Sequence, residues 1–328
     1  MTNDAIRPEQ DHPHVAEILA YFDTLSNWGR WGGEDRLGTL NYVTPDVTVA
    51  AASEIRDGGS VSCAWDIDGA DDLHGPSHRY MINTGQGLGD DNRVPQKHRR
   101  ANDRSAGAAE YVGFAFHGMN MTHIDALSHI FWDKAMYNGL PAEHVTAHAG
   151  AVSLAITDAA AGITSRGVLL DIPPVVGVEW LDPGFGVTPE LLEAAEERQG
   201  VTVRPGDIVF LRVGYSKRKR AEGPRPMNLG QAGWHATALP WLHQRQVAVI
   251  GNDGGQDAMP SGYHRDGLAM PIHAIGITAM GLWLLDNLDL EPLADACTVR
   301  NRWSFFMHLA PLRLSGATGS PLNPVAIF

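Results

Sequence analysis

Apolar residues near the amino end of the chain recur at the three- and four-residue spacing of a helix. In the segment 14–25 they would share one face: Val15, Ile18, Leu19, Phe22 and Leu25. We therefore predict an amphipathic helix over His14–Leu25. The next segment, 28–45, is rich in glycine and tryptophan and has no regular period, so an irregular path is expected there.

Local end signals predict three more helices. One runs from Pro45 to Arg56 and is ended by an aspartate and two glycines. A second covers Thr188–Gly200, whose first residue is a suitable N-cap, whose second is proline and whose last is glycine. The third covers Leu239–Arg245. The segment Ile272–Leu285 is longer and almost wholly apolar, which indicates a buried helix.

Short apolar runs bounded by turn residues are typical of strands. The chain has five of them: Val61–Ile67, Tyr111–Phe116, Gly167–Asp171, Asp207–Arg212 and Val247–Ile250. The segment 68–109 lacks periodicity and is predicted to form long loops near a site. The chain should end as a strand over 303–314, followed by a loop and tail over 316–328. Because strands and helices mix without strict alternation, we predict an α/β or α+β fold in a single domain.

The chain has 25 basic and 38 acidic side chains among 328 residues, a formal net charge of −13. This balance argues against a nucleic-acid partner or an anionic membrane surface. The one basic run, 217–220, is interpreted as a solvated loop. No apolar signal segment or run of about 18 apolar residues is present, and Cys63 and Cys297 form no disulfide framework. A soluble, cytoplasmic protein is therefore predicted.

Several hydrolytic and nucleotide-binding motifs are absent. The sequence has no Gly-x-Ser-x-Gly, no P-loop, no His-Glu-x-x-His and no Cys-x-x-Cys pair. The glycines of 85–89 lack the spacing and preceding strand of a dinucleotide loop, so a plain turn is favoured. His144 and His148 would share one face of a helix, but no nearby carboxylate supports a metal site there.

Three histidines and an aspartate lie within the segment 117–129: His117, His123, Asp125 and His129. Neutral imidazole and carboxylate together suit zinc, manganese or iron in the +2 state. On an extended segment, His123 and Asp125 point to the same side, and His129 is within reach if the chain turns. A metal site that activates water is the chemistry this spacing favours.

The run Met-Thr-His-Ile-Asp-Ala-Leu-Ser-His, residues 121–129, resembles the signature of the metal-dependent cyclase family, which includes kynurenine formamidases and isatin hydrolases. The family pattern is His-x-Gly-Thr-His-x-Asp-x-Pro-x-His. Four residues are in register with its last part: Thr122, His123, Asp125 and His129. Downstream segments are also similar to the family: Arg166–Asp171, Pro205–Gly214, Gly251–Asp253 and the closing strand pair over Pro311–Pro321.

The resemblance implies a fold and a domain organisation. It covers roughly residues 60–328, which would form a single swivelling β/β/α-type metal hydrolase domain. Residues 1–59 would form a helical amino-terminal extension, because the Trp28-Gly-Arg-Trp-Gly and Leu37-Gly-Thr-Leu-Asn stretches resemble that of the family's longer members. Homo-oligomers, dimers or tetramers, are usual in the family and are expected here.

The resemblance also implies roles for particular residues. His123 and Asp125 would be metal ligands, and His129 a general base or a ligand of a second metal. His273 would be a further ligand, and Asp286 would stand where formamidases have a catalytic glutamate. The family's first histidine falls on Met119, whose thioether is a poor ligand for such ions. His117, two residues earlier, would keep the same face of a strand and is the candidate ligand.

These roles predict hydrolysis of an amide, lactam or lactone with one or two Zn²⁺ or Mn²⁺ ions and a small-molecule substrate. Five residues are candidates for substrate binding: Trp28, Trp31, Phe131, His235 and Asp253. Two alternatives stay open at this point. One is a non-catalytic, metal-dependent small-molecule binding protein on the same scaffold, and the other is a serine hydrolase with an unrecognised elbow.

Overall fold

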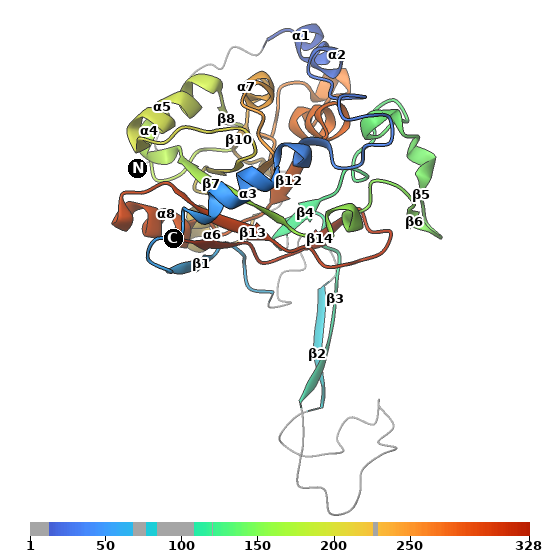
Figure 1. Ribbon diagram of the computed structural model, residues 1–328. Helices are drawn as coiled ribbons and strands as arrows, with labels where there is room; N and C mark the ends of the chain where they lie inside the picture. Colours follow the sequence, from blue (N-terminus) through green and yellow to red (C-terminus); the bar gives the residue numbers. More distant parts are fainter. Residues whose placement is uncertain (1–12, 68–76, 84–107, 120, 226–228) are drawn as a thin grey trace, which may run out of the picture.

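The centre of the molecule is a mixed β-sheet (Figure 1). The computed structural model describes residues 13–67, 77–83, 108–119, 121–225 and 229–328. Within these residues the sheet has nine strands, in the order β1 (Ser60–Ser62), β15 (Val325–Ile327), β13 (Ser304–Leu309), β7 (Ile163–Asp171), β9 (Ile208–Arg212), β11 (Val249–Asn252), β12 (Trp283–Asp286), β4 (His123–Asp125) and β14 (Gly319–Pro321). The mixed α/β class predicted from the sequence is confirmed.

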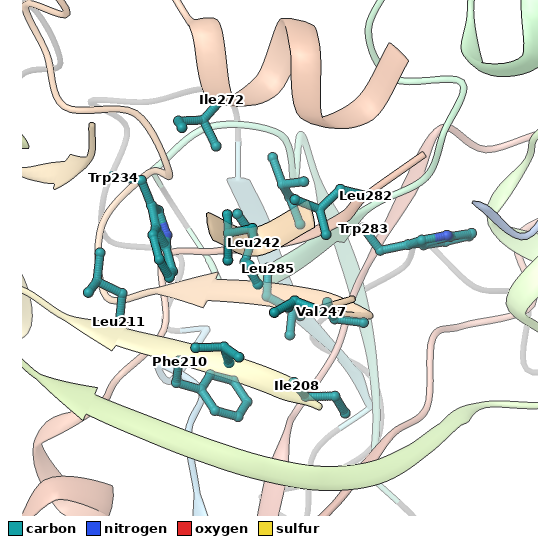
Figure 2. Packing of buried hydrophobic residues seen from close by; sticks show 14 of the residues in the cluster. Ile208, Phe210, Leu211, Trp234, Leu242, Val247, Ile272, Leu282, Trp283 and Leu285 are labelled. Carbon is teal, nitrogen blue, oxygen red and sulfur yellow. The ribbon is translucent and has the colours of Figure 1, made fainter. Parts of the chain in front are cut away.

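Four parallel strands, β7, β9, β11 and β12, form the middle of this sheet. Beyond β7 the sheet continues with antiparallel pairs, and beyond β12 it ends with antiparallel β4 and β14. All five residues of β9 are buried, which explains its unbroken apolar run. Figure 2 shows how Phe210 and Leu211 of β9 pack with Trp234 and Leu285 in the core.

Three two-stranded ribbons lie outside the main sheet: β2 (Ser77–Asn83) with β3 (Ala109–Phe114), β5 (Val145–Thr146) with β6 (Gly150–Ala151), and β8 (Gly186–Val187) with β10 (Gly233–Trp234). The β2–β3 ribbon extends away from the body of the molecule (Figure 1). The prediction of loops was therefore wrong for 77–83, which pairs with β3 as an antiparallel strand. The rest of 68–107 lies outside the described residues.

The helices cover the sheet and connect its strands (Figure 1). The α-helices are α1 (Val15–Leu19), α2 (Tyr21–Thr24), α3 (Pro45–Ala52), α4 (Pro173–Val176), α5 (Pro189–Gln199), α6 (Tyr215–Glu222), α7 (Ala238–Gln244) and α8 (Glu291–Arg300). The short 3₁₀ turns are η1 (Gly38–Tyr42), η3 (Tyr137–Gly139), η4 (Ala142–His144), η5 (Ile156–Ala159) and η7 (His264–Asp266). One π-helix, η8 (Ile272–Met280), follows η7. Helix α3 packs on β7 and β13, and η8 packs on β12.

The helix predictions from end signals agree with the structure. Helix α5 has Thr188 at its N-cap, and Gly200 ends it in the left-handed conformation at φ 61°. Helix α3 begins at Pro45 as expected but ends four residues early, at Ala52. The predicted helix over His14–Leu25 is divided into α1 and α2.

Two segments, one apolar and one basic, differ from their predictions. The helix expected over Ile272–Leu285 ends at Met280, Gly281 turns the chain at φ 66°, and β12 follows. Periodicity could not separate the two elements, because every residue from 272 to 286 is buried. The basic run 217–220 is not a loop but part of α6, where Arg218 pairs with Glu222 one turn later.

The two ends of the chain also differ from the prediction. Residues 316–328 are not a loop and tail, because β14 and β15 both join the main sheet. The strand expected over Val61–Ile67 is only the three residues of β1. The division at residues 59 and 60 stays a prediction. Of the helices that the structure describes, none combines the length and apolar character that a membrane span needs.

Charged pairs join β7 to β9 at two places. Arg166 donates to both carboxylate oxygens of Asp207 at 2.6 and 2.9 Å, and Arg212 donates to Asp171 at 2.7 Å. All four residues are at most 8% exposed. The parallel register places Asp171 opposite Arg212, so each pair links neighbouring strands rather than distant elements.

We expect the Asp207→Ala variant to lose about 3–5 kcal/mol of unfolding free energy, because it leaves the buried Arg166 guanidinium without its carboxylate. Urea denaturation followed by circular dichroism measures the loss. The matched control is Asp57→Ala, which removes the solvent-exposed partner of Arg300 and should cost much less. Equal losses in the two variants would contradict this account of the β7–β9 pair.

Candidate metal centre

Strand β4 carries the predicted ligands His123 and Asp125 into the middle of the molecule. It pairs with β12 on one side, with His123 opposite Asp286, and with β14 on the other, with Asp125 opposite Gly319. Side chains alternate along a strand, so His123 and Asp125 share a face, and Asp286 shares it with them. The sheet therefore brings together residues more than 150 positions apart.

The Asp125 carboxylate is the centre of the cluster. Four histidine nitrogens surround it: His117 Nδ1 at 2.9 Å from Oδ1, His123 Nε2 at 3.6 Å from Oδ1, His273 Nε2 at 3.7 Å from Oδ2 and His129 Nε2 at 3.9 Å from Oδ2. Asp286 Oδ2 lies 3.4 Å from the same nitrogen of His273. The structure thus brings together all six residues predicted as metal ligands or catalytic groups.

The cluster is buried on one side and open on the other. The side chains of Asp125 and His123 are 1% and 2% exposed, whereas those of His117 and His129 are 28% and 24% exposed. The rings of His117 and His129 stack in parallel, 3.8 Å apart. A small molecule from solvent would therefore meet these two rings first.

Each ligand histidine has its second ring nitrogen held by a neighbour. His123 Nδ1 lies 3.0 Å from the Met121 carbonyl oxygen, which accepts hydrogen bonds only, so Nδ1 carries the proton. The lone pair of His123 Nε2 then faces Asp125. His117 Nε2 bonds with the Thr318 hydroxyl at 2.9 Å. Such partners fix the tautomer and orientation of a metal-binding histidine.

Asp257 holds His273 in the same way. Its carboxylate lies 2.5 Å from His273 Nδ1 and also accepts from the backbone amides of Ile272 and His273 at 2.7 and 3.3 Å. One buried side chain therefore caps the start of the π-helix η8 and orients the ring that the helix carries. π-Helical turns are rare and often lie at functional sites.

Gln256 orients Asp286. Its Nε2 donates to Asp286 Oδ1 and to the Leu285 carbonyl oxygen, both at 2.6 Å, and its Oε1 accepts from Trp234 at 3.0 Å. With Oδ1 held, Oδ2 of Asp286 is directed toward His273. The shorter aspartate at this position still reaches the cluster, since β12 places it directly opposite His123.

Burial and charge shift the acid–base equilibria of the cluster. Burial alone would raise the pKa of Asp125, but the neighbouring histidines, His129, His117 and His123, favour its ionised form and hold this pKa well below its usual range. Burial lowers the pKa of His129 to about 4, despite the opposing charge of Asp125, so its imidazole is neutral at neutral pH. Burial also opposes charge on His273, but Asp257 and Asp286 raise the pKa of His273 well above its usual value.

The donor set fits a divalent metal ion. Both carboxylate oxygens of Asp125 and Nδ1 of His117 are buried and have no hydrogen-bond partner in the part of the chain that the structure describes. Nδ1 of His117 lies 2.9 Å from Oδ1 of Asp125, so two possible ligand atoms converge there. Unsatisfied buried groups are costly unless an ion completes them.

Two groups of three residues have ligand atoms within 4.8 Å of one another: His117, His123 and Asp125, and Asp125, His273 and Asp286. Asp125 belongs to both groups. Nitrogen and carboxylate ligands of this kind suit divalent transition metals.

His117 reaches the cluster by a route that differs from the sequence argument. Strand β3 ends at Phe114, and Gly118 has φ 115°, so no continuous strand joins His117 to His123. Among the described residues, His117 is in a loop that Thr318 anchors. Met119 is buried and its carbonyl oxygen accepts from Asn287.

The five residues predicted to bind substrate lie in different surroundings. Phe131, two residues after His129, is 44% exposed. The Trp28 indole donates to the Thr278 carbonyl oxygen, and Trp31 packs edge-on against Tyr42. His235 is buried with Nδ1 beside the Thr237 hydroxyl. Asp253 is fully buried, and its oxygens accept from the amides of Val213 and Ser216.

Sequence reasoning missed four residues that shape the cluster: Gln256, Asp257, Thr318 and Gly319. Gln256 and Asp257 lie just beyond the glycine-rich stretch in which Asp253 was chosen. The glycine-rich stretch indicated a functional loop, but nothing in it distinguished Asp257 from Asp253. Thr318 and Gly319 lie in a segment predicted as a tail, where no local pattern indicates contact with a histidine 201 residues away.

Comparison with known proteins identifies the family. The Cyclase family model matches residues 90–256, just over half of the chain. The crystal structure of a novel cyclase is 30% identical over 93% of this chain and 100% of its own, with a TM-score of 0.83. No curated protein matches the chain.

Isatin hydrolases share the fold at lower identity. Isatin hydrolase A from Labrenzia aggregata, bound to benzyl benzoate, is 19% identical over 88% of this chain and 98% of its own, with a TM-score of 0.54. Isatin hydrolase A from Ralstonia solanacearum is 20% identical over 86% and 97%, with a TM-score of 0.56. At these identities the likeness is one of fold alone.

The fold and the cluster define an α/β protein whose buried carboxylate and histidines form a centre suited to a divalent metal. The chain belongs to the Cyclase family. The resemblance noted in the segment 121–129 and the fold expected from it are thereby confirmed.

We expect the Gly319→Ala variant to be less stable by about 1–3 kcal/mol and to bind Mn²⁺ more weakly. A Cβ at this position would lie 2.6 Å from the Ile124 carbonyl oxygen and 2.8 Å from His117 Cε1, so β4 or His117 must shift. Thermal unfolding and Mn²⁺ titration measure the two effects. Gly33→Ala is the control, because its Cβ meets no atom within 4 Å. Unchanged Mn²⁺ binding in Gly319→Ala would show that this glycine does not position His117.

We expect Asp257→Ala to weaken Mn²⁺ binding about 10- to 100-fold, because His273 loses the carboxylate that fixes its tautomer and ring orientation. Isothermal titration with Mn²⁺ measures the change, and circular dichroism checks that η8 still forms. Asp266→Ala, which removes an exposed carboxylate nearby, is the matched control. Equal Mn²⁺ affinities in the two variants would contradict the role assigned to Asp257.

Proposed function

We propose that this protein is a metal-dependent hydrolase that cleaves an amide, lactam or lactone bond. The observation that carries the proposal is the Asp125 carboxylate, buried among four histidines and shared by two three-residue ligand groups. The isatin hydrolases with the same fold support the hydrolase class. The proposal for this chain extends to the class of bond cleaved and not to their substrate.

We assign His117, His123 and Asp125 to one divalent ion, and Asp125, His273 and Asp286 to a second when two are bound. Zn²⁺ and Mn²⁺ are the ions proposed, since both accept imidazole and carboxylate together. When bound, such an ion supplies a water of lowered pKa and polarises the substrate carbonyl. Asp257 and Gln256 keep His273 and Asp286 in place during the reaction.

His129 is proposed as the group that moves protons. It belongs to neither three-residue group, its Nε2 faces Asp125 at 3.9 Å, and its ring is partly open to solvent. The Nε2 atom would take a proton from the attacking water and pass it to the departing nitrogen or oxygen of the substrate. Stacking on His117 fixes the plane in which the ring acts.

Phe131 is the proposed contact for an apolar part of the substrate. It is close to His129 in the chain and 44% of it is exposed, so a ligand that reaches His129 can cover it. Asp253, by contrast, is engaged with two backbone amides and is better placed to support the end of β9 than to meet a ligand.

We expect His129→Ala to lower kcat/KM about 100- to 10,000-fold while the bound metal is retained. The substrates to screen are N-formyl amides, lactams and unsaturated lactones, and metal content is measured by mass spectrometry. His148→Ala removes an exposed histidine outside the cluster and should leave both quantities unchanged. The hydrolase proposal fails if wild-type protein binds no metal, or if its activity withstands both chelators and His129→Ala.

A further inference from the structure

A cavity of about 300 Å³ lies apart from the metal cluster. Its walls come from the segments 149–158 and 315–316 and from Arg36. No residue of the cluster lines it. The side chains that give it chemistry are polar: Arg36, Ser153, Thr157, Asp158 and Ser315.

Two opposite charges face this cavity without forming an ion pair with each other. Oδ2 of Asp158 is shielded from solvent and has no hydrogen-bond partner among the described residues. Burial raises the pKa of Asp158 and the charge of Arg36 opposes this shift; both residues line the cavity.

The cavity wall around residues 151–155 is held in shape by contacts within the protein. Ser153 Oγ lies 2.8 Å from His144 Nδ1, and Leu154 is buried with φ 58°, a conformation that surrounding contacts must maintain. The Ala151 amide donates to the Gly316 carbonyl oxygen at 2.8 Å, which joins the two walls. The cavity is therefore formed before any ligand arrives.

The size and charges of the cavity limit the ligand. A volume of about 300 Å³ is at the lower end for small-molecule sites. One guanidinium, one carboxylate and several hydroxyls suit a small polar molecule that carries both charges. We propose that this cavity binds a small free amino acid, whose carboxylate pairs with Arg36 and whose ammonium group pairs with Asp158.

The proposed amino-acid site shares no residue with the metal centre, but the chain connects the two closely. Gly316 is two residues from Thr318, which holds His117, and the Leu154 carbonyl oxygen accepts from the amide of Ser128 beside His129. The proposal does not depend on hydrolysis, because the pairing groups Arg36 and Asp158 are not metal ligands.

Isothermal titration of the full-length protein with glycine and with L-alanine tests the proposal. We expect saturable binding of at least one of them with a Kd below about 1 mM. Acetate and methylamine, which carry one charge each, should bind at least about tenfold more weakly, because each can form only one of the two ion pairs.

Variants locate the binding. Arg36→Gln and Asp158→Asn should each weaken it about 10- to 100-fold, and Arg56→Gln, at an exposed arginine elsewhere, should not change it. Circular dichroism confirms that the variants fold. The proposal is overturned if neither amino acid saturates, if acetate or methylamine binds equally well, or if binding survives both variants, as it would when the amino acid binds a metal in the cluster.

Discussion

The burial of the Asp125 carboxylate is the constraint to which most of the site responds. Moving a carboxylate out of water costs several kcal/mol unless charges or hydrogen bonds compensate for it. Here four histidine nitrogens surround the carboxylate, and the second nitrogens of His123, His117 and His273 are anchored by the Met121 carbonyl, the Thr318 hydroxyl and the Asp257 carboxylate. Met121, Thr318 and Asp257 therefore orient the imidazole rings, and these rings in turn stabilise the buried carboxylate of Asp125.

The sheet could be predicted from the sequence wherever burial leaves a local pattern. Apolar runs predicted β7, β9 and β11, and the spacing of residues in 117–129 predicted the cluster of possible metal ligands. The end of η8 could not be located, because uniformly buried residues have no period. The local pattern missed β14 and β15 since both are only three residues long, although the family resemblance placed a closing strand pair over Pro311–Pro321. Asp257 and Thr318 act through contacts between distant segments, and no local pattern encodes these.

The amino-terminal segment supports the π-helix from the end opposite to Asp257. Asn27 donates to the Met280 carbonyl oxygen, Trp28 to that of Thr278, and Thr39 to that of Gly281. These carbonyls lie at the helix end that has no further turn to accept from. The helix that carries His273 is thus held at its start by a buried carboxylate and at its end by residues from the beginning of the described chain.

The antiparallel pairing of β4 has a consequence for how the protein is made. His123 and Asp125 acquire their neighbours only when β12 and β14 are in place, and Thr122 and His117 bond with residues 165 and 201 positions further along. A nascent chain whose last strands are still inside the ribosome has the ligand residues of 117–129 but has not yet assembled the metal centre. We therefore expect metal capture to follow the pairing of β4 with β12 and β14, so that its free energy stabilises the folded sheet rather than earlier fragments of the chain.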